Sequence, residues 1–291
     1  MYFLLTRSTL MVQILKLLLS YSTSKAFVFL SAISVFTSVI GFSITDLNFI
    51  QNWYMTLGAF IVLHLFILAI LMMSYAAKLR FGKVSFKFND STLTIKAGNI
   101  LSSMNDTYVV IPCNSTYDLV VDNDRLSEKS LQAKLIKIYE NDGKKRNIED
   151  VISNQNHPIP GEIQYRNKET HYPIGTIKKL EGKYMLLSFS ELDSQKQIKH
   201  SWQSYDSCLR VMWKQIQLQH QQKEVILPLL GGGHTVFDRI PDNLNQELLH
   251  TIIHTFATTV EAANIKNVTI LLQPKALLGM NLTSLSSRFK K

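Results

Sequence analysis

Residues 225–237, VILPLLGGGHTVF, hold the pattern that decides the fold. Their apolar start predicts a short buried strand, which three consecutive glycines end abruptly. Helical periodicity follows from Asp242 to Ala263. In a strand, glycine turn and helix of this kind, backbone N–H groups can close around a phosphate, because glycine places no Cβ between the chain and the anion. Glycine triplets also occur in ordinary turns, so this stretch alone leaves both interpretations open.

Strands and helices alternate on both sides of this stretch. The polar segment Asn141–Ile163 reads as an inserted surface loop, and Ser127 is a suitable N-cap for the helix that precedes it. From residue 107 onward the alternation predicts an α/β layered domain with a mixed, mostly parallel sheet. Strands are expected at Val84–Phe88, Thr92–Ala97, Thr107–Pro112, Tyr184–Glu191 and Asn267–Gln273, and further helices at Glu128–Glu140 and Ser201–Gln221.

Charge is distributed unevenly along the 291 residues. The net charge is +9, and residues 1–80 contribute +4 of it, from five basic residues and one acidic residue. The remaining +5 is spread over the rest of the chain, whereas a nucleic-acid-binding domain would concentrate its basic residues. The two cysteines, Cys113 and Cys208, have neither metal-site spacing nor a disulfide framework. We therefore expect no nucleic-acid partner and a reducing environment.

The N-terminal segment, residues 1–25, is apolar but interrupted at helical spacing. Its polar residues recur at steps of three and four and therefore form one stripe along a helix. Such an amphipathic helix is expected at a membrane interface or against other helices, with a signal peptide as the alternative. The stripe consists of Thr6, Thr9, Gln13, Lys16 and Ser20.

Residues 26–80 predict a two-helix transmembrane hairpin. Ala26–Ile44 has no charged residue, and Thr56–Ala77 has His64 as its one titratable group. Both stretches are long enough to cross a hydrocarbon core of about 30 Å. Basic residues flank the pair and are absent from the short loop between, so both termini are expected in the cytoplasm, with residues 81–291 as a cytosolic domain. His64 is interpreted either as a pore group or as a residue that faces a neighbouring helix.

Three loops with small or amide residues follow strands of the predicted domain. In a parallel sheet, ligands collect outside the carboxyl ends of the strands. Asparagine amides suit a ribose or a base edge, and Phe237 is interpreted either as a stacking ring or as an ordinary core aromatic. The candidate ligand-binding residues are Asn99, Ile100, Cys113, Asn114, Ser115, Gly231, Gly232, Gly233, His234, Thr235, Val236 and Phe237.

These loops together resemble the macro domain, an α/β fold that binds ADP-ribose. The resemblance is carried by Gly98-Asn99-Ile100 after a strand, a strand that ends at Asn114, and Pro228-Leu229-Leu230-Gly231-Gly232-Gly233, and it covers roughly residues 84–275. It implies a three-layer domain whose ligand is an ADP-ribose derivative, with no cofactor. The family's adenine-reading acid is replaced here by Asn99, which alters the contact to the purine edge.

A further departure bears on activity. The Asn-Ala-Ala-Asn run of the hydrolytic macro domains is replaced here by Pro112-Cys113-Asn114-Ser115-Thr116. The resemblance therefore implies binding without hydrolysis, although a membrane-tethered ADP-ribosyl hydrolase stays open as the enzyme alternative. A non-enzymatic protein-binding scaffold is the third possibility.

Three longer stretches resemble a divergent macro branch that is found behind a two-span membrane hairpin. They are Tyr172–Thr176, Tyr184–Asp193 and Ile226–Thr235. Such proteins resemble the membrane effectors of Thoeris-type bacterial antiphage systems. The resemblance implies a place in the inner membrane, a homo-oligomer on ligand binding, and a signal made from NAD by a partner TIR-domain enzyme. The implied signal is histidine linked to ADP-ribose, and the implied outcome is disruption of the lipid bilayer.

Other catalytic templates fit the sequence poorly. Neither a P-loop nor a Rossmann glycine fingerprint occurs, and no serine has a nucleophile-elbow context. His250 and His254 stand four residues apart on a predicted helix, but no third ligand accompanies them, so we expect no metal site.

Overall fold

The computed structural model describes residue 28 and residues 53–289, apart from 103–105, 123–125, 154–159, 167–168, 181, 192–198 and 234. The chain divides into two compact units, Met1–Gly82 and Lys83–Lys291. The predicted amphipathic helix at 1–25 lies outside the described residues. So does the first predicted span at 26–44, apart from residue 28.

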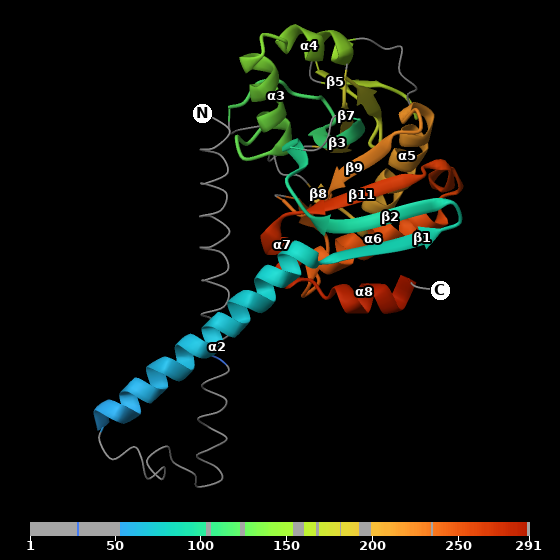
Figure 1. Cartoon of the computed structure of the whole chain (residues 1–291). Coiled ribbons are helices and arrows are strands. Elements are labelled where there is room, and N and C mark those ends of the chain that lie inside the picture. Colours follow the sequence, from blue (N-terminus) through green and yellow to red (C-terminus); the bar gives the residue numbers. More distant parts are fainter. Residues whose placement is uncertain are drawn as a thin grey trace. The chain divides into compact units, whose positions relative to one another are not determined.

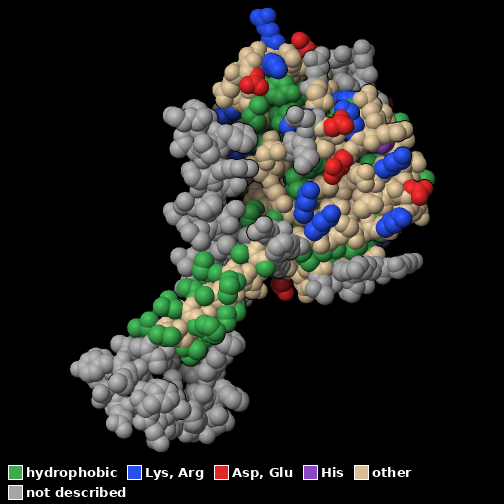
Figure 2. All heavy atoms as spheres, in the orientation of Figure 1, with side chains coloured by type: hydrophobic (Ala, Val, Ile, Leu, Met, Phe, Trp, Pro, Cys, Tyr) green, Lys and Arg blue, Asp and Glu red, His purple; other side chains and the backbone are tan. Residues whose placement is uncertain are grey.

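In the first unit the described structure is mainly the helix α2, Trp53–Phe81. Apolar side chains on this helix are exposed, among them Val62, Phe66 and Met73, and they form the hydrophobic surface along α2 in Figure 2. The predicted second span, residues 56–77, falls within α2. Among the described helices, however, none has both the length and the apolar character needed to cross a membrane, which differs from the expected hairpin.

The second unit is built on a seven-stranded sheet with the order β1-β2-β11-β9-β3-β7-β6. Pairing is parallel from β2 through β11, β9 and β3 to β7, while the two outer pairs are antiparallel. The mixed, mostly parallel sheet is therefore confirmed. The strands are β1 Lys83–Phe88, β2 Ser91–Ala97, β3 Thr107–Asn114, β6 Ile177–Lys179, β7 Tyr184–Ser190, β9 Glu224–Pro228 and β11 Asn267–Leu272.

Helices cover both faces of the sheet because the chain crosses it in two directions. The connection after β3 runs outward to β7, whereas those after β7 and β9 run back toward β11. Parallel crossovers are right-handed, so helices on opposite runs lie on opposite faces. The first run carries α3, Leu131–Asn141, and α4, Lys145–Ser153. The return runs carry α5, Trp202–Gln219, and α6, Leu244–Thr258. Figure 1 shows α3 and α4 gathered near β3 and β7.

The core follows the pleat of the central strands. Val109, Ile111 and Cys113, alternate residues of β3, belong to one hydrophobic cluster together with residues of α3 and α4. Every residue of β7 is buried, as expected for a strand that is covered on both faces. The apolar runs that predicted strands are therefore those that fill the interior.

Two predictions for the segment 127–163 were wrong. The helix before the insertion begins at Leu131 and is capped by Ser130, whose Oγ accepts a hydrogen bond from Ala133 N at 3.0 Å. Ser127 instead closes the preceding turn, since its carbonyl accepts from Ser130 N at 2.9 Å. The expected surface loop contains α4, because Ile148, Val151 and Ile152 are spaced so that they share one helix face toward the core.

The remaining elements are short and were not expected from the sequence, apart from η3, which overlaps the end of the helix predicted at Asp242–Ala263. The hairpin β4–β5, Gln164–Arg166 and Glu169–His171, stands apart from the main sheet, as does the pair β8, Lys199–His200, and β10, Val236–Phe237. The 3-10 turns η2 and η3 span Ile100–Ser102 and Val260–Asn264, and the chain closes with α7, Pro274–Gly279, and α8, Leu282–Phe289.

Candidate functional site

The three predicted loops meet at one edge of the sheet. Because β2, β11, β9 and β3 are parallel, their carboxyl ends lie on the same side. Val109 of β3 pairs with Ile226 of β9, and the two strands end at Asn114 and Pro228, so the loops that follow them leave the sheet from neighbouring strands. On the other side of β11, Gly98 N donates to Leu272 O at 3.1 Å. The edge therefore carries the asparagine loops and the glycine loop side by side.

The glycine loop has a buried base and an open tip. Gly231 has φ +81°, and a Cβ there would lie 3.1 Å from Leu248 Cδ2 and 3.1 Å from Phe237 Cζ, so glycine is required by both conformation and space. Gly232 and Gly233 are exposed, and a Cβ on Gly233 would have no atom within 4 Å. Backbone is therefore accessible at the tip, as an anion site needs.

The rest of this loop is only partly described. Thr235 is half-buried and Val236 is exposed, whereas His234 lies outside the described residues. Its predicted contribution of charge to the ligand therefore stays a prediction.

The loop after β2 is a short capped turn. Asn99 is exposed, and its Oδ1 accepts from Leu101 N at 3.2 Å, while its carbonyl accepts from Ser102 N at 3.3 Å. Ile100 is buried and belongs to the same core cluster as β3. Ile100 thus anchors the turn, and Asn99 is presented at the surface.

Asn114 is held tightly within its own loop. Its Nδ2 donates to Asp118 Oδ2 at 2.6 Å, and its Oδ1 accepts from Asp118 N at 2.9 Å. Cys113, one residue earlier, is buried, and burial raises the pKa of its thiol far above the ordinary range, so it is neutral and unreactive. Asn114 therefore shapes the loop, and Asp118 is a partner that sequence reasoning missed.

Ser115 connects the β3 loop to two other segments. Its N–H donates to Ser190 O at 2.8 Å, and its carbonyl accepts from Tyr172 N at 2.9 Å. Its Oγ lies 3.3 Å from Nδ1 of His171, at the end of the β4–β5 hairpin. Sequence reasoning missed His171, because a hairpin that pairs only with itself leaves no local sign of where its last residue lies.

Phe237 lies within an aromatic cluster under the glycine loop. Its ring stacks on Trp202 at a centroid distance of 4.8 Å and lies 6.2 Å from the His200 ring. The Trp202 Nε1 donates to Arg239 O at 2.8 Å, and Tyr205 Oη donates to Leu230 O at 3.0 Å. Burial lowers the pKa of His200, so this ring is neutral near pH 7. These contacts hold the two ends of the glycine loop, at Leu230 and at Phe237.

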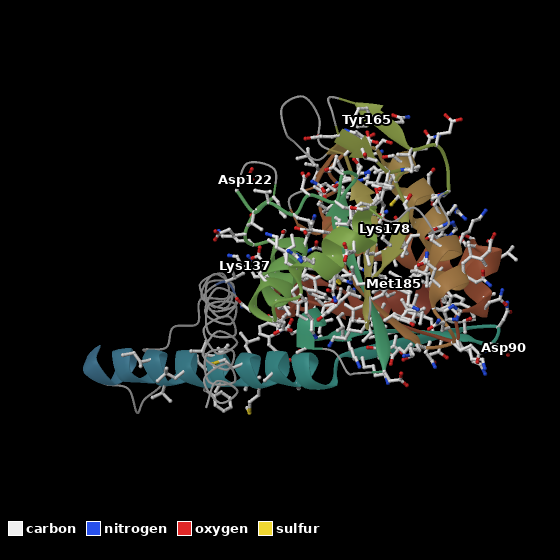
Figure 3. All side chains as sticks on the ribbon, turned by 90° about the horizontal axis from the view of Figure 1, so that it is seen from above. Asp90, Asp122, Lys137, Tyr165, Lys178 and Met185 are labelled. Atoms are coloured by element: carbon white, nitrogen blue, oxygen red, sulfur yellow. The ribbon has the colours of Figure 1, made fainter. Side chains whose placement is uncertain are left out.

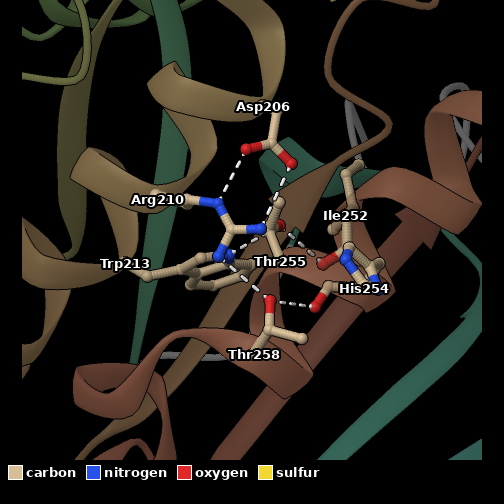
Figure 4. Close-up of polar contacts among 7 residues, drawn as sticks. All are labelled: Asp206, Arg210, Trp213, Ile252, His254, Thr255 and Thr258. Carbon is tan, nitrogen blue, oxygen red and sulfur yellow. Dashed lines mark hydrogen bonds and ion pairs between the residues drawn. The ribbon is translucent and has the colours of Figure 1, made fainter. Parts of the chain in front are cut away.

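Helices α5 and α6 are joined by polar contacts behind this cluster (Figure 4). Arg210 Nε donates to Asp206 Oδ2 at 2.7 Å, and its Nη1 donates to Thr258 Oγ1 at 3.0 Å. The buried Trp213 donates from Nε1 to Thr255 Oγ1 at 3.1 Å. These contacts join the middle of α5 to the C-terminal end of α6.

Metal ligands do not cluster in the part of the chain that the structure describes, where no group of three or more His, Cys, Asp or Glu side chains could hold an ion. His250 lies 3.3 Å from the Gln246 amide nitrogen and 3.6 Å from a Glu247 carboxylate oxygen. Its ring also lies 6.1 Å from the Phe289 ring, so this histidine packs between α6 and α8.

Comparisons with known proteins identify the family of this chain. The family described as "Thoeris protein ThsA, Macro domain" matches residues 93–273. The Thoeris protein ThsA of Bacillus amyloliquefaciens (strain Y2) is 30% identical over 214 residues, which cover 70% of this chain and 70% of that protein.

Solved macrodomains of Oceanobacillus iheyensis are more distant. A mutant with ADPR is 12% identical, with 70% of this chain and 99% of that chain covered and a TM-score of 0.38. The macrodomain with ADP is 11% identical, with 71% and 97% covered and the same TM-score of 0.38. From the family match and its ThsA relative, this chain belongs to the family of the Thoeris protein ThsA, with a ThsA-type macro domain over residues 93–273.

Proposed function

We propose that this protein binds an ADP-ribose-derived nucleotide at the carboxyl edge of its sheet and acts as an effector in Thoeris antiphage defence. The observation that carries the proposal is the placement of an open glycine loop at the same edge of the sheet as the loops that hold Asn114 and Asn99. Membership of the ThsA family supports the defence context.

The roles follow from the edge geometry. The exposed backbone at Gly233 offers its N–H group to a diphosphate without a side chain in the way, while Gly232 N donates to Leu229 O at 3.3 Å and so shapes the turn. Asn99 is surface-exposed after β2, so its amide and backbone are placed to contact a base. Asn114 has its amide committed to Asp118, and it therefore acts by holding the loop that borders the sugar.

Binding without hydrolysis fits this geometry better than catalysis. The amide of Asn114 is paired with Asp118, and the thiol of Cys113 is buried and neutral, so neither group activates water or attacks a sugar carbon. Incubation of the protein with an ADP-ribosylated protein substrate tests this assignment. Release of ADP-ribose that is lost on Asn114→Ala would establish the hydrolase instead.

Calorimetry of the full chain with ADP-ribose tests the binding proposal. Gly233→Val adds a side chain in open space, so the fold is expected to remain intact while ADP-ribose affinity falls at least tenfold. Gly279→Val is the matched control, because that glycine is also exposed with no atom within 4 Å of an added Cβ. Absence of wild-type binding at millimolar ADP-ribose would reject the proposal and favour a protein-binding scaffold.

The downstream steps of this proposal come from the resemblance to Thoeris membrane effectors, and the membrane orientation comes from the charge pattern of residues 1–80. A TIR-domain enzyme supplies the signal, ligand binding drives homo-oligomer formation, and the N-terminal unit acts on the inner membrane with both termini in the cytoplasm. A ligand favours the assembled state only through a higher affinity for that state. The exposed apolar residues of α2 support an apolar environment for this helix.

Two measurements test these steps. Light scattering of the full chain with and without ADP-ribose should show a larger assembly with ligand. Alkaline extraction of cell membranes should leave the protein in the pellet if residues 26–80 are embedded in lipid. Recovery in the supernatant would exclude the membrane step while leaving ligand binding untouched.

A further inference from the structure

The β4–β5 hairpin ends at the edge that carries the proposed ligand site. Gln164 pairs with His171 and Arg166 with Glu169, and among the strands that the structure describes the hairpin pairs only with itself. Its C-terminal end is tied to the edge, because Tyr172 N donates to Ser115 O at 2.9 Å and Ser115 N donates to Ser190 O at 2.8 Å. His171 is thus delivered beside the ends of β3 and β7.

The ring of His171 is oriented by Ser115. The serine hydroxyl is buried, with 2% of the residue exposed, and it lies 3.3 Å from Nδ1, while His171 itself is half-buried. A hydrogen bond at one ring nitrogen determines how the other is presented. Among the described residues, none bonds to Nε2 of His171, and the half-buried ring keeps part of its surface in contact with solvent.

The hairpin end is braced from behind. Tyr172 Oη donates to Ile152 O at 3.0 Å, and Lys178 Nζ donates to the same carbonyl at 2.6 Å. The Lys178 ammonium also lies 4.1 Å from the centre of the Tyr172 ring. Figure 3 shows Lys178 of β6 within the domain and Tyr165 of the β4–β5 hairpin at the margin of the domain. Because these contacts already order the end of the hairpin, His171 loses little conformational entropy when a ligand binds, which suits it to recognition.

The position of His171 along the edge identifies the part of the ligand that it can reach. From β2, where Asn99 lies, to β3, where Ser115 lies, there are three strand spacings, or about 14 Å. The glycine loop after β9 lies between them. A ligand with its diphosphate on the glycines and its adenosine toward Asn99 therefore directs its other end toward Ser115 and His171.

We propose that His171, oriented by Ser115, contacts the ligand beyond its diphosphate and selects nucleotides that carry a second, hydroxyl-bearing sugar or a polar group attached to it. The inference rests on the proposed function, since it concerns the distal end of the same site. An imidazole with one free nitrogen either accepts from a hydroxyl or donates to an oxygen. A site built for such a contact discriminates against a ligand that lacks it, because its polar group is then left unpaired.

Calorimetry of the full chain with ADP-ribose and with ADP tests the inference, because ADP ends at the diphosphate. His171→Phe is expected to weaken ADP-ribose binding about tenfold, or 1.4 kcal/mol, and to leave ADP binding within about twofold. His171→Gln retains a hydrogen-bonding group and should recover most of the loss. Tyr165→Ala is the matched control, because this residue lies on the same hairpin and is 73% exposed.

The outcomes separate the two proposals. Equal losses for ADP and ADP-ribose in His171→Phe, or no loss for either, would overturn the role of His171 while leaving nucleotide binding in place. Failure of the wild-type chain to bind either nucleotide would overturn both. Ser115→Ala gives a second route: its loss for ADP-ribose should be smaller than that of His171→Phe and should disappear in the His171→Phe background, because the serine acts through the histidine. Full additivity of the two losses would contradict that role.

Discussion

The glycine loop and the β4–β5 hairpin reach the same edge of the sheet by different means. The loop follows β9 directly, so its place is set by the strand that precedes it and by the helix that comes after it. Within the described part of the chain the hairpin has no strand partner in the main sheet, and backbone bonds to Ser115 and a side-chain contact to Ile152 hold its end. A local pattern thus locates the first region, whereas long-range contacts locate the second.

This difference suggests variants that separate fold from ligand binding within one loop. Gly231→Val is expected to destabilise the domain by about 2–4 kcal/mol, because the residue has positive φ and its Cβ would crowd Leu248 and Phe237. Urea denaturation measures the change. Gly233→Val, two residues away, should leave the free energy of unfolding within about 0.5 kcal/mol. Equal stability of the two variants would show that the loop base is not built as described.

A middle-sized effect is expected at the loop after β3. Asn114→Ala removes both bonds to Asp118 and leaves a half-buried carboxylate and backbone N–H with fewer partners, at a cost of about 1–3 kcal/mol. The loss should appear in thermal unfolding of the unliganded protein. Asn114→Ala with wild-type stability and lost ADP-ribose binding would instead assign this amide directly to the ligand.

The smallest expected effect concerns Lys178, which contacts Tyr172 and Ile152 behind the hairpin, and it depends on pH. Burial lowers the pKa of Lys178 from its ordinary value of 10.5 to about 8 in the folded protein. Between pH 8 and 10.5 the unfolded chain binds more protons at this residue, so its contribution to stability rises with pH and is lost as pH falls toward 8.

Comparison with Lys178→Met isolates this contribution. From pH 7 to pH 9 the wild-type protein should gain about 1 kcal/mol relative to the variant, measured as a difference in unfolding free energy. Lys179→Met, a change at the neighbouring position, is the control for general charge effects. If the unfolding free energies of wild type and Lys178→Met changed with pH in parallel, the Lys178 ammonium would not be desolvated in the folded protein, and the lowered pKa would be wrong.

Segments with a strong local signal were predictable in this chain. The apolar runs of β3, β7, β9 and β11 match the predicted strands to within one or two residues, because buried parallel strands are apolar throughout. Helix α5 also matches, since Ser201 caps it and its buried face repeats at helical spacing. The family resemblance, drawn from the same loops, is confirmed by the ThsA match.

Segments with short or competing sequence signals were not predictable. Ser127 and Ser130 are equally good caps by type, and only the packing of α3 on β3 selects Ser130. In α4, charged residues outnumber apolar ones, so its sequence gives only a weak helical pattern. Burial of Ile148 in the core of the folded domain stabilises the helix. The strands β4, β5, β8 and β10 have two or three residues each, which is too short for the alternation of apolar and polar residues that identifies a strand in a sequence.

The sequence by itself determined the α/β class, the central strands, the family and the three loops at the carboxyl edge of the sheet, because each depends on residues that are neighbours along the chain. Tertiary structure alone decided that Asn114 is paired with Asp118, that Phe237 lies in an aromatic cluster with Trp202, and that His171 stands beside Ser115. The last two contacts join residues far apart in sequence, and a hydrogen bond or ring contact of that kind leaves no periodic mark in the sequence.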